Sequence, residues 1–326
     1  MKRLLLLLLA VSLHAAGPVQ VAFDSQVILW NNRCITNNPY SRTTGVALNS
    51  TISLLASSVW MGGVRSAGLY PGNILRANLM CGGSYGGTNG CGDCSTVGCY
   101  NIGSPQIPLI NDSGGGMDTA LTSTQYYWKY QETGSSGGLS CVSAANYVAL
   151  NTGLIPSSIS SFTDDAHLAI YTMGNSGLAA DYTMGMQSFV GVGNGQMAML
   201  VACCGTSLHV ASLWTETAHI VTAPSGNNGS GFFLSTRTSS ATNGVTNYRN
   251  GVSSGSSTTV AGSPYSPCNL DYPVYIFCLN DRNTPVSYTT NRSGGYAIGR
   301  GVTASVSTNN YYQAWQQFET LLGRQK

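Results

Sequence analysis

The feature that most constrains this fold is a series of short, evenly spaced segments with β-strand patterns between residues 125 and 300. Each segment is either continuously apolar or alternates apolar and polar residues, and Gly, Ser, Asn or Pro separates it from the next. This spacing is typical of an all-β sandwich or barrel and not of alternating strand–helix units. The expected strands are 125–131, 147–150, 167–172, 182–189, 196–203, 209–214, 219–223, 231–237, 246–249, 258–261, 274–279 and 296–299.

One of the turns between these strands has a specific signal. Asn250-Gly251 follows Arg249 at the end of an expected strand. Asn and Gly tolerate the positive φ angles that both central residues of a type I′ turn require. The dipeptide therefore predicts a tight hairpin.

The last fifty residues are expected to close the domain. Residues 272–280 form an apolar run that indicates one buried strand, and a second, glycine-rich strand follows at 294–301. Thr303 is then expected to cap a helix. The helix would have one apolar face and would end at Gly323, with two basic residues near its C-terminus. The face consists of Tyr311, Trp315, Phe318 and Leu322, and the basic residues are Arg324 and Lys326.

The N-terminus predicts export from the cytoplasm. Lys2 and Arg3 precede an apolar run at residues 4–11, and small residues follow at 15–17. This order is typical of a secretory signal peptide comprising residues 1–17, and the run is too short for a membrane anchor. Residues 18–105 are expected to form a small helical, Cys- and Gly-rich region, and residues 106–326 the β domain. The mature protein is expected to be secreted, without a membrane span.

Charge argues against a nucleic-acid partner. Only 8% of the residues are charged, the formal net charge is +2, and the sequence contains no basic run. Hydrophobic residues make up 43% of the chain, which is enough for a core, so Ser, Thr, Asn and Gly must supply most of the polar surface.

Four of the ten cysteines lie close together. They are Cys81, Cys91, Cys94 and Cys99. In an exported protein such a cluster favours disulfides, so these four are the disulfide candidates. The Cys91-Gly-Asp-Cys94 spacing also fits a metal knuckle, but no histidine lies nearby to complete a mixed site.

Several of these segments resemble a known family. Residues 138–139, 146–154, 166–171, 231–237 and 248–252 are similar to segments of concanavalin A-like, laminin G-like β-sandwich domains of phage tail and bacterial surface proteins. The most specific match is the segment 296–303 followed by 318–324, which resembles the closing strand and helix of these domains. The resemblance implies two antiparallel sheets and a glycan-binding or adhesive role. The signal peptide and the cysteine cluster depart from the phage pattern.

The sequence contains no recognisable catalytic group, so the protein is expected not to be an enzyme. Glycosidases of this fold need two facing carboxylates. The three glutamates, Glu132, Glu216 and Glu319, have no acidic residue two positions away. No Gly-x-Ser-x-Gly nucleophile motif is present.

The histidines are read as structural residues. His167 fits a strand position and is expected to be hydrogen-bonded within the fold. His209 and His219 lie on either side of Trp214 and Glu216. A metal site there is the alternative to a solvent-exposed strand face.

No cofactor is expected apart from calcium. Laminin G-like sandwiches hold calcium at a sheet rim, where Asp side chains and backbone carbonyls are its ligands. Asp164, Asp165 and Asp181 lie in or near expected loops and are the candidate ligands.

The sequence favours a secreted protein that recognises glycans or cell surfaces. Tyr and Trp combine an apolar body with a polar tip, which suits sugar binding. The densest clusters are 126–128 and Tyr311-Tyr312, although both also fit core positions. The alternative is a structural subunit of an extracellular or phage-tail-like assembly, which would self-associate as a homo-oligomer. A glycoside hydrolase is the third hypothesis.

Overall fold

The protein is described by a computed structural model. The described residues are 23–37, 51–80, 108–113, 119–121, 128–131, 138–141, 149–160, 162, 165–174, 182–189, 194–203, 208–213, 219–222, 229–238, 245–256, 271–289, 291–306 and 310–326. Residues 1–17, the expected signal peptide, lie outside this part of the chain. None of the helices within the described ranges combines the length and the apolar character that crossing a bilayer requires.

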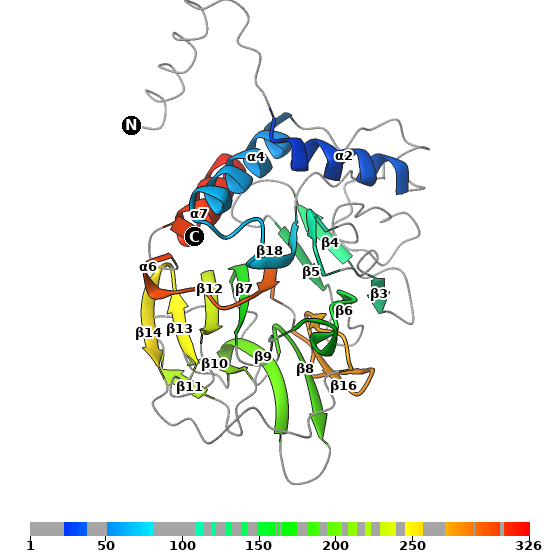
Figure 1. Cartoon of the computed structure of the whole chain (residues 1–326), viewed down its shortest axis with the longest axis vertical. Coiled ribbons are helices and arrows are strands. Elements are labelled where there is room, and N and C mark those ends of the chain that lie inside the picture. The colour runs from blue at the N-terminus through cyan, green and yellow to red at the C-terminus, as the bar shows by residue number, and fades with distance from the viewer. Residues whose placement is uncertain are drawn as a thin grey trace, which may run out of the picture.

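The described strands form two sheets (Figure 1), which confirms the prediction of a mainly β fold. The first sheet is antiparallel throughout, and β7 and β18 lie at its centre. Its order is β14 (Val252–Ser256), β13 (Thr246–Arg249), β12 (Ser230–Arg237), β7 (Ala166–Met173), β18 (Ser293–Gly299), β1 (Ile74–Leu79) and β2 (Ile110–Asn111). The strand β5 (Gly138–Cys141) also pairs with β18, and β4 (Trp128–Gln131) pairs with β5.

The second sheet has β8 and β9 near its centre. Its order is β11 (His219–Thr222), β10 (Leu208–Leu213), β9 (Asn194–Cys203), β8 (Met184–Phe189), β15 (Tyr275–Ile276), β6 (Ala149–Asn151) and β3 (Thr119–Leu121). A short hairpin of β16 (Leu279–Asp281) and β17 (Thr284–Val286) joins it through β16, which runs parallel to β8.

The main core lies between the two sheets because alternate residues of each strand point toward the other sheet. The first sheet contributes Leu168, Ile170 and Phe233, and the second contributes methionines from β8 and β9. These methionines are Met184, Met186, Met197 and Met199, and all are fully buried. Unbranched Met side chains fill irregular space well, which suits the gap between two twisted sheets.

Helices cover the outer face of the first sheet and form a third layer. They are α2 (Ser25–Asn37), α4 (Thr51–Ser66) and α7 (Tyr312–Leu321), with the short α6 (Ala304–Val306) before α7; a 3-10 turn, η1 (Pro156–Ser158), precedes β7. Trp60 of α4 meets Trp315 of α7 edge to face, with 5.4 Å between ring centroids. A Cβ on Gly63 would lie 2.6 Å from the Cβ of Ala314, so glycine permits the close approach of the two helices seen in Figure 1.

The structure confirms the apolar face of the closing helix, but the helix begins later than predicted. Trp315, Phe318 and Leu322 are buried against the first sheet. However, α7 begins at Tyr312, and Thr303 precedes only the three-residue α6. The expected cap at Thr303 is therefore wrong for the main helix, whose start is set by packing on the sheet.

The expected single strand at 272–280 is also wrong. The chain forms β15, leaves the strand at Phe277 with a φ of 70°, and returns as β16 in the opposite direction along β8. Phe277 is buried in the core between the sheets. Burying its ring offsets the cost of an unfavourable backbone angle, which periodicity alone does not reveal.

Residues from the expected N-terminal region share the core of the sandwich. The strand β1 pairs with β18 over Ile74 to Leu79, and α4 packs on α7. The described residues 51–80 are therefore integrated with the first sheet and its helices.

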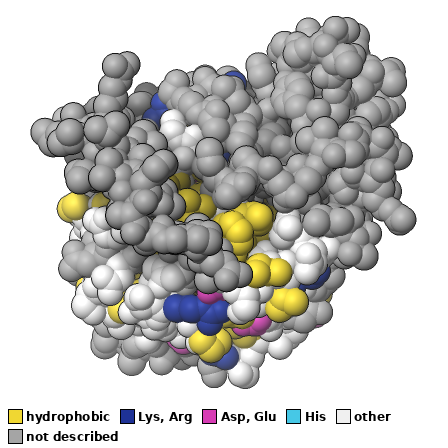
Figure 2. All heavy atoms as spheres, turned by 90° about the horizontal axis from the view of Figure 1, so that it is seen from above, with side chains coloured by type: hydrophobic (Ala, Val, Ile, Leu, Met, Phe, Trp, Pro, Cys, Tyr) yellow, Lys and Arg dark blue, Asp and Glu magenta, His cyan; other side chains and the backbone are white. Residues whose placement is uncertain are grey.

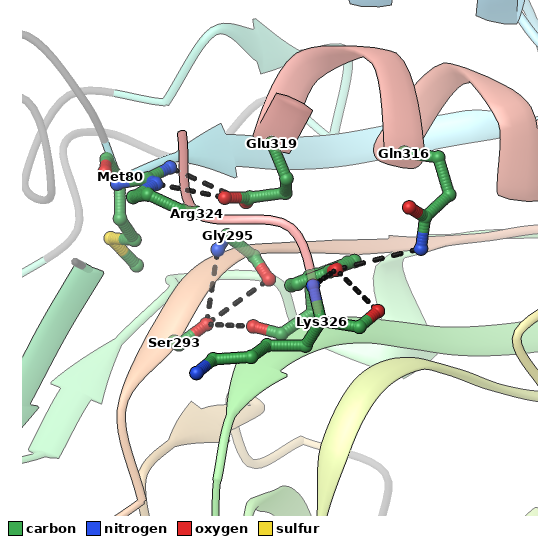
Figure 3. A network of polar contacts seen from close by, with 8 residues as sticks. Met80, Ser293, Gly295, Gln316, Glu319, Arg324 and Lys326 are labelled. Carbon is green, nitrogen blue, oxygen red and sulfur yellow. Dashed lines mark hydrogen bonds and ion pairs between the residues drawn. The ribbon is translucent and has the colours of Figure 1, made fainter. Parts of the chain in front are cut away.

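A buried polar network attaches the C-terminal segment to this layer (Figure 3). Arg324 donates to the Glu319 carboxylate at 2.8 Å and to the Met80 carbonyl at 2.7 Å. Both charged side chains are fully buried. Two residues further on, the backbone N–H of Lys326 donates to the Tyr171 hydroxyl at 2.8 Å. The chain end is thus held to both β1 and β7.

The Asn250-Gly251 turn forms as predicted and provides a stability test. Its residues have φ angles of 50° and 77°, and Arg249 pairs with Val252. We expect Gly251→Ala to lower the free energy of unfolding by about 1–2 kcal/mol, because a Cβ is disfavoured in the left-handed region. Urea unfolding monitored by tryptophan fluorescence would measure the change.

Gly62→Ala is the matched control for this substitution. Gly62 is exposed in α4, and a Cβ there would meet nothing within 4 Å. Alanine is the better helix former, so this change should stabilise the protein by about 0.5–1 kcal/mol. Equal effects of the two substitutions would contradict the role assigned to the turn.

Candidate functional site

The acidic residues expected to bind calcium are only partly within the described chain. Asp165 lies just before β7, and its carboxylate accepts a hydrogen bond from the backbone N–H of Gly301 at 2.9 Å. Asp164 and Asp181 lie outside the described residues. Among the residues that the structure does describe, no three His, Cys, Asp or Glu side chains are grouped for a metal ion. Calcium binding stays a prediction.

The predicted disulfide cysteines are not described by the structure either. Cys81, Cys91, Cys94 and Cys99 all lie outside the described residues. Cys278 is buried and forms no disulfide with another described cysteine. Burial raises the pKa of its thiol, so it stays protonated and packs as a small apolar residue.

His167 is a structural residue, as the sequence suggested. Its ring is fully buried, Nδ1 donates to the Arg300 carbonyl, and Nε2 faces the Tyr311 hydroxyl at 3.4 Å. Burial lowers the pKa of His167 to about 4, because a charged imidazolium would lose its hydration there. The side chains of His209 and His219 lie outside the described part of the chain.

Where the structure describes them, the tyrosine clusters noted in the sequence pack in the core and do not form an exposed binding surface. Tyr311 is fully buried and meets Phe232 with 5.3 Å between ring centroids. Tyr312 is partly buried against the same helix-facing core. The side chain of Trp128 lies outside the described residues.

A partly exposed polar surface lies instead on the outer side of the second sheet. We call it the tyrosine–glutamine face and define it by Tyr182, Gln187, Gln196, Asp281 and Tyr288. Gln187 of β8 and Gln196 of β9 are directly opposite each other, and Gln187 also pairs with Asp281 of β16. Tyr182 and Tyr288 meet in an isolated bridge beside them. All five residues are half-buried.

Hydrogen bonds organise this face while leaving donors available. The Gln196 amide nitrogen donates to the Tyr182 hydroxyl at 3.1 Å and to the Gln187 amide oxygen at 3.4 Å. These bonds use the Tyr182 oxygen and the Gln187 oxygen as acceptors. The Tyr182 O–H and the Gln187 NH₂ are therefore left to donate to a ligand or water.

The charged part of the face is a hairpin tip. Arg282 donates to the Asp281 carboxylate at 3.1 Å, and the side chains are 55% and 23% exposed. Arg282 and Asn283 have φ angles of 51° and 68°, so they form a second type I′ turn that projects these side chains. An exposed pair of this kind contributes little stability and is free to exchange partners with a ligand.

This face was not predicted, although the sequence contains a signal for it. In Met184-Gly-Met-Gln-Ser-Phe189 and Gln196-Met-Ala-Met199, methionine alternates with small or amide residues. The methionines are in the core, so Gln187 and Gln196 must point outward. The pairing that brings them together is a long-range property. Tyr182 and Tyr288 are more than one hundred residues apart.

Comparisons with known proteins identify no family. No family model matches the chain, and no curated protein matches it. Similar solved structures include the NanB sialidase of Streptococcus pneumoniae in a K499G mutant, with 10% identity and a TM-score of 0.39 over 59% of this chain and 27% of that chain. Another is domain 4 of AbnA, a GH43 extracellular arabinanase from Geobacillus stearothermophilus, in complex with arabinotriose. It matches with 14% identity and a TM-score of 0.37, over 60% of this chain and 89% of that chain.

A third similar structure is the botulinum neurotoxin serotype D binding domain. It has 6% identity and a TM-score of 0.38, over 74% of this chain and 51% of that chain. The chain thus spans about a quarter of the sialidase and half of the toxin domain. Likenesses at these scores do not place the protein in any of these groups.

These structures correct the expectation that the protein is not an enzyme. A sialidase and an arabinanase domain are among the folds that this chain resembles. The likeness does not by itself make this protein an enzyme.

Proposed function

We propose that this protein is a secreted β-sandwich of the concanavalin A-like or laminin G-like type that recognises glycans on a cell or matrix surface. The tyrosine–glutamine face is the proposed contact surface. The signal-peptide pattern at residues 1–17 supports secretion. The resemblance of the closing strand and helix supports the fold type.

The observation that carries the proposal is the Tyr182–Gln196–Gln187 chain of hydrogen bonds on an open sheet surface. Sugars present hydroxyl groups that both donate and accept, together with apolar ring faces. A phenol beside two amides matches both features, and neutral amides lose less hydration on binding than charged groups do. The low charge of the whole chain is consistent with a neutral ligand.

A glycan array followed by titration tests this proposal. The secreted protein would be screened in calcium and in chelator, and any bound glycan titrated by calorimetry. We expect Tyr182→Ala and Gln187→Ala each to weaken binding about tenfold, because each removes a hydrogen-bond donor worth about 1 kcal/mol together with contact area. Loss of glycan binding in chelator would indicate that a calcium ion is part of the binding site.

Gln317→Ala provides the matched control. Gln317 is exposed on α7, on the helical side of the molecule, and should not affect glycan binding. An array without saturable binding in either buffer would contradict the proposal. So would a glycan whose affinity is unchanged in both Tyr182→Ala and Gln187→Ala.

A further inference from the structure

A second polar site lies between the sheets, at the edge of the sandwich where β12, β13 and β14 lie near β10 and β11 (Figure 1). Residues directly opposite each other in an antiparallel pair share a face. Arg249 is opposite Phe233, and Asn247 is opposite Ser235. Phe233 belongs to the core between the sheets, whereas Tyr248 belongs to the helix-facing core. Asn247 and Arg249 therefore point between the sheets.

Asn247 is an unusual residue for that position. It is completely buried, yet within the described part of the chain neither its amide oxygen nor its amide nitrogen has a hydrogen-bond partner. Burying an unsatisfied amide costs stability, and native proteins pair nearly all such groups. An uncompensated polar group of this kind is expected where a ligand completes the hydrogen bonds.

Two guanidinium groups share this face. Arg249 is half-buried over the Phe233 ring and donates to the Ser230 carbonyl at 3.2 Å. Its buried Nε finds no partner among the residues that the structure describes. Arg237 is buried and donates to the Leu213 carbonyl at 3.1 Å. No carboxylate among the described residues forms an ion pair with Arg249. Among the described residues, this face therefore presents two guanidinium groups as donors and the Asn247 oxygen as an acceptor.

We propose that this edge binds a small carboxylate that carries a neighbouring hydroxyl group, such as a uronic acid residue. The carboxylate accepts hydrogen bonds from the Arg249 guanidinium and the Asn247 NH₂, and the ligand hydroxyl donates to the Asn247 oxygen. Gly255 of the outer strand β14 is opposite Asn247 and has no side chain, so a ligand would reach the buried amide past this strand. This site is separate from the tyrosine–glutamine face and does not depend on the function proposed there.

Calorimetric titration with D-glucuronate and D-glucose tests the site. Glucuronate has a carboxylate where glucose has a hydroxymethyl group. We therefore expect saturable binding of glucuronate and at least tenfold weaker binding of glucose. Asn247→Leu and Arg249→Met should each weaken glucuronate binding at least tenfold. Arg65→Met, which removes an exposed guanidinium from α4, is the control and should bind as the unmodified protein does.

Thermal unfolding of the ligand-free Asn247→Leu variant shows whether weaker binding results from the missing amide or from a failure to fold. Leucine removes the unsatisfied amide, so its melting temperature should equal or exceed that of the unmodified protein. The proposal is wrong if glucuronate does not bind, if glucose binds equally well, or if Asn247→Leu binds glucuronate unchanged. It is also wrong if Tyr182→Ala or Gln187→Ala abolishes glucuronate binding, since the ligand would then occupy the outer face.

Discussion

Replacing Arg324 with methionine is expected to lower the free energy of unfolding by about 3–5 kcal/mol, because it leaves the Glu319 carboxylate buried without its cation. Arg324 and Glu319 are both fully buried, and Arg324 also satisfies the Met80 carbonyl (Figure 3). The substitution therefore removes three hydrogen-bond donations from a site that excludes water. Denaturant unfolding at neutral pH would measure the loss.

Two further variants test whether this loss of stability comes from the buried, unpaired carboxylate. Arg65→Met removes a surface ion pair with Asp24 of similar geometry, at 3.1 Å, and should cost no more than about 1 kcal/mol because water screens that pair. In the Arg324→Met background, adding Glu319→Gln should recover part of the stability by removing the buried charge. A loss below 1 kcal/mol for Arg324→Met would show that the carboxylate finds other partners.

Lowering the pH from 7 to 4 is expected to remove about 3 kcal/mol of stability through His167 alone. The pKa of His167 is lowered by burial from its ordinary 6.5 to about 4 in the folded protein. Between these values the unfolded chain binds the proton and the folded chain does not, so stability falls as the pH falls. The contribution is complete above pH 6.5 and is lost as the pH approaches 4.

His167→Gln isolates this contribution from that of the carboxylates. Glutamine does not titrate, so the difference in stability between the two proteins should change with pH only from about 6.5 to 4. Unfolding curves at half-unit steps would measure it. Parallel stability–pH curves for the two proteins would show that His167 becomes protonated without a cost, which contradicts its burial against Tyr311 and the Arg300 carbonyl.

The surface composition of the sequence is also visible in the structure. Figure 2 shows the molecule from the side of the helices, where hydrophobic side chains lie next to Lys, Arg, Asp and Glu side chains on the described part of the surface. Ile28 and Leu29 of α2 are 45% and 56% exposed there. With 8% charged residues, the chain depends on hydroxyl and amide groups for its polar surface.

The sequence by itself determined the local elements of the fold, because those depend on residues that are close in the chain. The short apolar segment from His167 to Thr172 predicted β7, and spacings of three and four placed Trp315 and Phe318 on one helix face. The Asn250-Gly251 turn and the left-handed Gly323 just after the C-cap of α7 also followed from local chemistry. At that end, Gly323 has a φ of 68° and the Arg324 N–H bonds the Glu319 carbonyl.

Only the tertiary structure decided which elements meet. Strand order, the place of β1 beside β18, and the reversal at Phe277 depend on partners far away in the sequence. The same holds for the Arg324–Glu319 site, where Gly294 leaves room for the carboxylate, since a Cβ there would lie 2.0 Å from it. Tyr182 and Gln187, and likewise Asn247 and Arg249, gain their environments from opposing strands. Periodicity reports which side of an element is buried, but long-range pairing decides what each side contacts.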